Sequence, residues 1–123
     1  MKYLVVDDSL IMRRIVINAL KALGYQSFEE AEDGKVAMEI LRKEKIDFVI
    51  TDWNMPNMSG LELTLAIRGD DNLKNIPILM VTTRGNKEDI ISALNAKVNN
   101  YLVKPFNQIN LREKINAILG TSS

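Results

Sequence analysis

The 123-residue chain is long enough for one domain and leaves little room for a second. It contains neither cysteine nor histidine, which excludes disulfides, thiolate or imidazole metal sites, a serine–histidine triad and a phosphohistidine of its own. Its 16 Lys and Arg residues balance 16 Asp and Glu residues, so the overall charge does not indicate nucleic acid or an anionic membrane as a partner.

The N-terminal residues do not read as a targeting or membrane segment. Residues 1–6 are apolar for a few positions only before two aspartates follow, which is shorter than a signal peptide or a membrane span. We therefore expect a cytoplasmic protein, monomeric, in which residues 1–120 form the domain and residues 121–123 a loose tail.

The first half of the chain predicts three strands, at residues 4–6, 25–31 and 48–50. Ser9 is expected to cap a helix that ends at Gly24, and Asp33 to cap a second helix. The apolar positions expected to face the core are Ile11, Ile15, Ala19, Leu20 and Leu23 in the first helix, and Val36, Ala37, Ile40 and Leu41 in the second.

The second half continues the alternation. A loop marked by Pro56 and Gly60 leads to a third helix, and strands are predicted at residues 76–81 and 101–103. Asn86 and Asn107 can cap the last two helices. Their expected core positions, with those of the third helix, are Leu63, Ala66 and Ile67, then Ile90, Ile91 and Leu94, then Leu111, Ile115, Ile118 and Leu119. Five strands alternating with five helices predict an α/β domain around a parallel sheet.

Polar residues follow four of the predicted strands. Asp7 and Asp8 come after the first strand, Asp52 after the third, Thr82 at the end of the fourth and Lys104 after the fifth. Ligands of open α/β sheets bind outside the carboxyl ends of the strands. The sequence therefore predicts that these side chains meet at one edge of the sheet.

The chemistry of this set favours phosphoryl transfer. Three crowded carboxylates repel one another unless a cation intervenes, and oxygen ligands select a hard ion such as Mg²⁺. Lys104 can meet one phosphoryl oxygen as a point charge, and the Thr82 hydroxyl can donate to another. Asp52 beside a metal ion and a lysine is a competent phosphoryl acceptor.

Each residue taken alone also has a structural interpretation. An aspartate after a strand is usually a helix cap or a turn residue, Thr82 suits a strand, and Lys104 suits the surface. The order of the whole set, with each member at a strand end, favours the functional interpretation.

Several segments carry a family resemblance. They are Val5-Val6-Asp7-Asp8-Ser9, Met12-Arg13-Arg14-Ile15, Thr51-Asp52-Trp53-Asn54-Met55-Pro56 with Gly60, Val81-Thr82-Thr83, and Asn99-Asn100-Tyr101-Leu102-Val103-Lys104-Pro105-Phe106. Together they closely resemble the receiver domains of CheY-like chemotaxis response regulators. The resemblance spans nearly the whole chain and implies a doubly wound, flavodoxin-like sheet in the order 2-1-3-4-5.

The resemblance also implies a role for each site residue. Asp52 looks like the phosphoacceptor, and Thr82 and Lys104 like the residues that meet the phosphoryl group. The implied Mg²⁺ ligands are Asp8, Asp52 and the Asn54 backbone carbonyl, with Asp7 assisting. Tyr101 looks like an aromatic that changes rotamer with Thr82, and the Lys104–Pro105 bond is similar to one that is cis in the family.

The partners implied by the resemblance are a histidine kinase of the chemotaxis type, the flagellar motor switch and a phosphatase. The implied output surface includes Lys87, Ile90 and Tyr101. One alternative is a phosphorelay intermediate that passes the group to another histidine protein. Another is an aspartate-nucleophile phosphatase, but such enzymes use Asp-x-Asp, and Asn54 at the second position cannot protonate a leaving group. We therefore expect a signalling protein, not an enzyme, that assists its own phosphorylation and dephosphorylation.

Two positions depart from the family pattern. Lys97 stands where relatives usually have glycine, which predicts backbone strain if φ is positive there. Arg84 stands where relatives often have an acidic residue. A cation at this position either slows loss of the phosphoryl group and hinders a phosphatase, or is a solvated arginine.

Overall fold

Five parallel strands form the central sheet of the computed structural model, which describes residues 1–120. The strands are β1 Lys2–Val6, β2 Ser27–Ala31, β3 Phe48–Thr51, β4 Ile78–Thr82 and β5 Asn100–Val103. The helices are α1 Leu10–Ala22, α2 Gly34–Lys43, α3 Gly60–Arg68, α4 Lys87–Asn95 and α5 Gln108–Leu119. The strand order β2-β1-β3-β4-β5 confirms the predicted topology, and the predicted tail at residues 121–123 lies outside the described residues.

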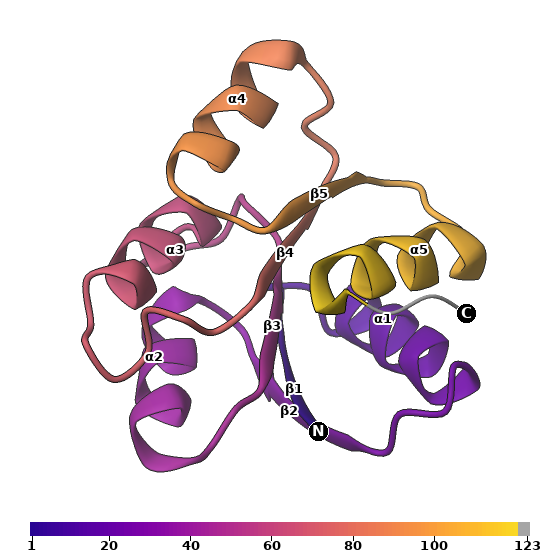
Figure 1. Cartoon of the computed structure of the whole chain (residues 1–123), viewed down its shortest axis with the longest axis horizontal. Helices are drawn as coiled ribbons and strands as arrows, with labels where there is room; N and C mark the ends of the chain where they lie inside the picture. Colours follow the sequence, from indigo (N-terminus) through magenta and orange to yellow (C-terminus); the bar gives the residue numbers. More distant parts are fainter. Residues whose placement is uncertain (121–123) are drawn as a thin grey trace.

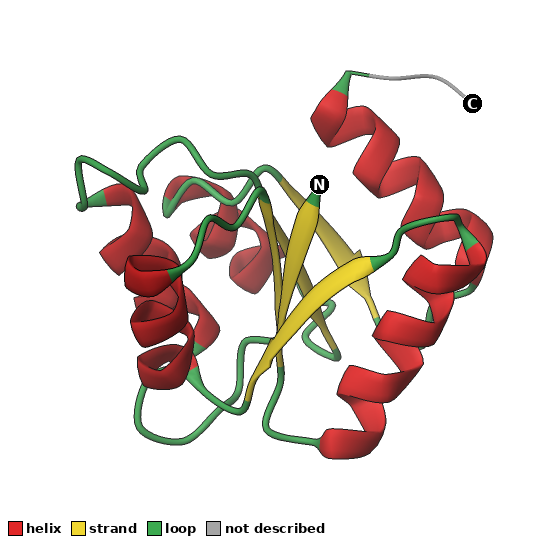
Figure 2. Cartoon of the chain, turned by 90° about the horizontal axis from the view of Figure 1, so that it is seen from below, coloured by secondary structure: helices red, strands yellow, loops and turns green. Residues whose placement is uncertain are grey.

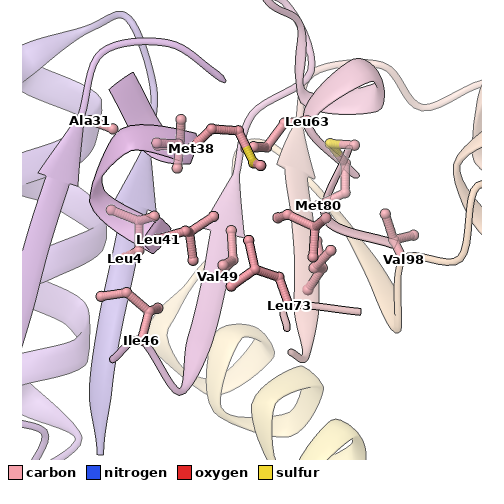
Figure 3. Close-up of a cluster of buried hydrophobic side chains, with 14 of the residues drawn as sticks. Leu4, Ala31, Met38, Leu41, Ile46, Val49, Leu63, Leu73, Met80 and Val98 are labelled. Atoms are coloured by element: carbon pink, nitrogen blue, oxygen red, sulfur yellow. The ribbon is translucent and has the colours of Figure 1, made fainter. Parts of the chain in front are cut away.

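The helices cover both faces of the sheet. Helices α1 and α5 lie on one face, and α2, α3 and α4 lie on the other (Figures 1 and 2). Successive strand residues point to opposite faces, so Val5 packs under α1 and α5 while Leu4 packs under α2. Figure 3 shows the second of these two clusters, in which Met38 and Leu63 from the helices meet Met80 from the sheet. No helix within residues 1–120 is long and apolar enough to span a membrane.

The predicted core faces of α1 and α4 were partly wrong. Ile11 and Ile15 are exposed, at 73% and 47%, whereas α1 buries Val16, Ile17 and Leu20. Each helical residue turns by about 100°, so the stripe through these three residues places Ile11 and Ile15 on the opposite side. An apolar residue on a helix therefore does not fix which side meets the sheet.

Helix α4 shows the same discrepancy. Ala93 is its buried residue and Ile90 packs at the edge of the core, whereas Ile91 and Leu94 are about half exposed. The helix contacts the sheet through the narrow stripe that Ile90 and Ala93 share at a spacing of three residues. Its remaining apolar side chains face outward.

All four predicted helix caps are confirmed. The side chains of Ser9, Asp33, Asn86 and Asn107 each accept a hydrogen bond from the backbone N–H three residues later. Asp33 has a second task, because its other carboxylate oxygen accepts a 2.7 Å hydrogen bond from Asn57 Nδ2. This bond ties the start of α2 to the loop that follows β3.

Lys97 adopts a φ of 76°, the positive value that glycine would adopt without strain. The surrounding hydrogen bonds hold this conformation. Arg68 donates from Nε to the Lys97 carbonyl at 3.0 Å and from Nη2 to Asn99 Oδ1 at 2.9 Å. The same guanidinium donates to two further backbone carbonyls, so α3 fixes the chain between α4 and β5.

The cap at Asp33 predicts a pH-dependent contribution to stability. The amide of Asn57 and the N–H of Val36 bind the ionised carboxylate and hold the pKa of Asp33 below its ordinary value of 3.8. A lowered pKa means that the contribution is complete above the unfolded pKa and is lost as the pH falls through the folded pKa. Asp33→Asn keeps one oxygen for the Val36 N–H but turns an NH2 group toward Asn57 Nδ2, so it should lower the free energy of unfolding by about 1 kcal/mol at pH 7.

Urea unfolding followed by circular dichroism measures this difference at pH 7 and at successively lower pH. The gap between wild type and Asp33→Asn should shrink as the pH falls below about 4. Asp71→Asn, at an exposed position, is the matched control and should stay close to wild type throughout. A gap that is equally large at pH 7 and pH 3 would contradict the proposed role of the carboxylate.

Candidate functional site

Asp7 and Asp52 lie side by side because β1 and β3 are paired in parallel register. Val6 is opposite Thr51, so the residues that follow them come together as the strands end. The Asp52 N–H donates to the Val6 carbonyl at 2.9 Å, which continues the ladder by one residue. This edge lies opposite the one at which the N-terminus and β1 begin, marked in Figure 2.

Lys104 brings a positive charge to the two acids. Its backbone N–H donates to the Thr82 carbonyl at 2.9 Å, and the following bond to Pro105 is cis. The Lys104 Nζ lies 3.0 Å from Asp7 Oδ2 and 3.2 Å from Asp52 Oδ2. The three side chains are 6% to 14% exposed, so water screens these ion pairs much less than it screens surface pairs.

Asp7, Asp8 and Asp52 form a group suited to a metal ion. Each offers one carboxylate oxygen, and these oxygens lie within 4.8 Å of one another. Asp7 is buried while Asp8 is exposed, so the group opens to solvent on one side. An all-oxygen donor set with an open side fits Mg²⁺, which retains several waters. The Asn54 backbone carbonyl stays a predicted ligand.

Asp52 is held by backbone contacts on both of its sides. Its Oδ1 accepts a 2.6 Å hydrogen bond from the Trp53 N–H. Gly60, at the start of α3, donates its N–H to the Trp53 carbonyl at 2.8 Å, and a Cβ at Gly60 would lie 1.9 Å from the Asp52 carbonyl oxygen. Only glycine fits this approach, so α3 presses directly against the backbone that carries the acid.

Thr82 and Tyr101 lie on the neighbouring strands β4 and β5, and both are bound to the backbone of Arg84. Thr82 ends β4 fully buried, and its Oγ1 accepts from the Arg84 N–H at 3.4 Å. Tyr101 is only 7% exposed, and its hydroxyl donates to the Arg84 carbonyl at 2.7 Å. Burial, assisted by the negative charges of Asp89 and Asp52 and opposed by Arg84, raises the pKa of Tyr101 to about 12. The hydroxyl therefore stays a hydrogen-bond donor at neutral pH.

The predicted output residues are close to this pair. Lys87 is exposed at the first position of α4, and Ile90 is half-buried one turn later. Tyr101 packs in the same core cluster as Ile90, which places that residue of α4 against β5.

The sequence did not reveal the contacts that two arginines make at the site. Arg13 donates from Nη1 to the Asp7 carbonyl at 2.7 Å and from Nε to Glu30 at 3.0 Å. Arg84 is bound to Asn54 and Asp89 while its side chain stays 38% exposed, so it is partly solvated and also holds two polar partners. No local pattern identifies Glu30 as the partner of Arg13 or Asn54 as the partner of Arg84, since these pairs are 17 and 30 residues apart.

Comparison with known proteins agrees with this geometry. Residues 3–116 match the family described as the response regulator receiver domain. The chemotaxis protein CheY1 of Helicobacter pylori is 52% identical, over 99% of this chain and 99% of its own length. The solved structure of the chemotaxis response regulator CheY4 of Vibrio cholerae is 37% identical, with a TM-score of 0.87 over 95% of this chain and 97% of that one.

A further solved structure is the receiver domain of a sensor histidine kinase from Pseudomonas aeruginosa, described with a magnesium ion coordinated in its active-site cleft. It is 27% identical, with a TM-score of 0.87 and 98% of each chain covered. The sequence match, the strand order and the site geometry agree, and the chain therefore belongs to the response regulator receiver family and, within it, to the CheY-type chemotaxis regulators.

Proposed function

We propose that this protein accepts a phosphoryl group on Asp52 from the phosphohistidine of a separate kinase, and that the phosphorylated form binds the flagellar motor switch. The observation that carries the proposal is the position of Lys104, whose ammonium contacts both Asp7 and Asp52 at the open end of a carboxylate group. A buried cation there offsets charge on the acceptor and on the incoming group.

The donor in this transfer is the kinase's phosphohistidine. A carboxylate oxygen of Asp52 forms a bond to phosphorus as the phosphorus–nitrogen bond breaks. The imidazole leaves with the electron pair of that bond and takes up a proton from water. The chain positions the acceptor through Trp53 and Gly60 and supplies the Lys104 ammonium beside Asp52 Oδ2, where it would offset the charge of the incoming phosphoryl oxygens.

Asp8, Asp52 and the Asn54 carbonyl would hold Mg²⁺, with Asp7 assisting through water. The donor set fits this ion, and the magnesium described in the Pseudomonas aeruginosa receiver domain supports the proposal. The bound ion supplies charge neutralisation between the acids and the phosphoryl oxygens.

The signal leaves through Thr82 and Tyr101. A phosphoryl group gives the Thr82 hydroxyl a strong acceptor, and Tyr101 packs on the side of β4 that this movement affects. The surface formed by Lys87, Ile90 and Tyr101 exists in two conformations, and phosphorylation increases the population of the one that binds the motor switch. A dedicated phosphatase would reset the switch by hydrolysing the phosphoaspartate. An aspartate-nucleophile phosphatase would need a second acid two residues after Asp52, and Asn54 has an amide there, which cannot protonate a leaving group.

Asp52→Asn tests the acceptor. Wild type incubated with acetyl phosphate and Mg²⁺ should gain the mass of one phosphoryl group, and the variant should gain none, because an amide is not a nucleophile. Intact-mass spectrometry measures the result, and chelation of the metal with EDTA should prevent labelling of wild type. Undiminished labelling of the variant would assign the group to another residue.

Asp8→Ala tests the metal ligands. Trp53 adjoins Asp52, so its fluorescence should report Mg²⁺ binding. Loss of one ligand should weaken binding by roughly tenfold, although less repulsion between the two remaining acids offsets part of the loss. Asp71→Ala, which removes an exposed carboxylate elsewhere, is the matched control. An identical titration for Asp8→Ala and wild type would show that Asp8 is no ligand.

Thr82→Ala tests the route of the signal. The variant should still be phosphorylated on Asp52, because the threonine is not the acceptor. Beryllofluoride with Mg²⁺ should raise wild-type affinity for a motor-switch peptide by on the order of tenfold and raise that of the variant much less. Calorimetry measures both affinities. If beryllofluoride strengthens binding equally in the two proteins, Thr82 serves only the strand.

A further inference from the structure

Arg84 joins the loop that follows Asp52 to the start of α4. Its Nη2 and Nε donate to Asn54 Oδ1 at 2.7 and 3.1 Å, and its Nη1 lies 3.4 Å from Asp89 Oδ2. The guanidinium carbon stands 4.6 Å from the centre of the Trp53 ring. One side chain thus connects the loop behind the acceptor with the first turn of α4.

The backbone of Arg84 lies at the switch itself. Its N–H points to Thr82 Oγ1 at 3.4 Å, and its carbonyl accepts the Tyr101 hydroxyl at 2.7 Å. The guanidinium is also bound to the residue two positions after Asp52. The positive charge is therefore held over the loop that directly follows Asp52, against Trp53 and Asn54.

The present partners of the guanidinium are weak competitors for it. Asn54 offers a neutral amide oxygen, and the Asp89 carboxylate is 3.4 Å away and also accepts from Asn86 Nδ2 at 2.9 Å. The side chains of Arg84 and Asp89 are 38% and 23% exposed, so water screens their attraction. A phosphoryl group brings a charge of about −2 and three acceptor oxygens, which a guanidinium binds in preference to either.

We propose that the guanidinium of Arg84 moves from Asp89 to the phosphoryl group when Asp52 is phosphorylated, and that Arg84 is in this way a positioning residue of the switch. The inference rests on the proposed function, since it requires the group on Asp52. When the guanidinium leaves Asp89, the first turn of α4 loses its tie to the acceptor loop. Lys87 is the first residue of that turn, and Ile90 directly follows Asp89. Phosphorylation therefore changes the output surface by a second route, which does not use the Thr82 hydroxyl.

Competition between two acceptors predicts substitutions of opposite effect. We would titrate beryllofluoride in the presence of Mg²⁺ and measure the bound fraction by ¹⁹F NMR. Arg84→Gln removes the guanidinium and should weaken beryllofluoride binding by about threefold or more. Asp89→Asn removes the competing carboxylate and should strengthen it by about two- to fivefold, while its amide oxygen still accepts from Asn86.

The double variant separates competition from a general charge effect. In the Arg84→Gln background, Asp89→Asn should change the affinity little, because the cation for which it competes is absent. Equal strengthening in both backgrounds would mean that Asp89 acts only by repelling the anion, and would overturn the proposal. Unchanged affinity in Arg84→Gln would overturn it as well. Arg84→Lys, which keeps the charge without the planar fork, should be intermediate.

Two further measurements complete the test. Arg112→Gln removes an exposed cation on α5 and should leave the affinity as in wild type.

In ¹H–¹⁵N spectra the amides of Glu88, Asp89 and Ile90 should shift with beryllofluoride in wild type and shift less in Arg84→Gln. Equal shifts in both proteins would contradict a role for Arg84 in moving α4. A wild-type protein that binds no beryllofluoride would instead refute the proposed function, so the two failures are distinguishable.

Discussion

The ammonium of Lys104 between Asp7 and Asp52 is the interaction on which the site depends. Parallel pairing of β1 with β3 forces two carboxylates together at the end of the sheet, and the pairing of β4 with β5 carries Lys104 to them. With Asp8, three negative charges face one positive charge, and one bound divalent cation would neutralise the difference. Phosphorylation replaces the single charge of the Asp52 carboxylate by a phosphoryl group of about −2, so the site gains about one further negative charge, and the Thr82 hydroxyl brings no positive charge to offset it. In our proposal Arg84, which is bound to Asn54 two residues after Asp52, supplies the second cation.

Much of the architecture could be predicted from the sequence because it follows from local chemistry. Strands covered on both faces need continuous apolar runs, and residues 48–50 and 78–81 are such runs. Ser9, Asp33, Asn86 and Asn107 cap helices because their side chains compete for backbone N–H groups. The convergence of Asp7, Asp52 and Lys104 could also be predicted, because parallel strands end at one edge and only the order of the strands had to come from the family resemblance.

Properties that depend on what packs across the sheet could not be predicted. Ile11 and Ile15 lie on a helix rich in apolar residues, and only the position of that helix on the sheet decides which side is buried. The bond between Asp33 and Asn57 joins residues whose distance in sequence hides their contact. The sequence predicted strain at Lys97 only if its φ is positive. The positive φ and the Arg68 hydrogen bond that holds it depend on the tertiary fold. The same is true of Gly60, whose role appears only when α3 meets the Asp52 carbonyl.

The two routes that we propose from the site to the surface meet at Arg84 but use different parts of it. Tyr101 is bound to the Arg84 carbonyl, a group that any residue at this position supplies. The link to Asp89 and Asn54 uses the guanidinium, which only arginine supplies. A substitution at position 84 therefore changes the second route while it leaves the acceptor of the first in place. The charge of this side chain would therefore set how strongly phosphorylation affects α4, while the hydrogen bond of Tyr101 to the backbone carbonyl is retained. The strength of the coupling can then change without loss of the switch itself.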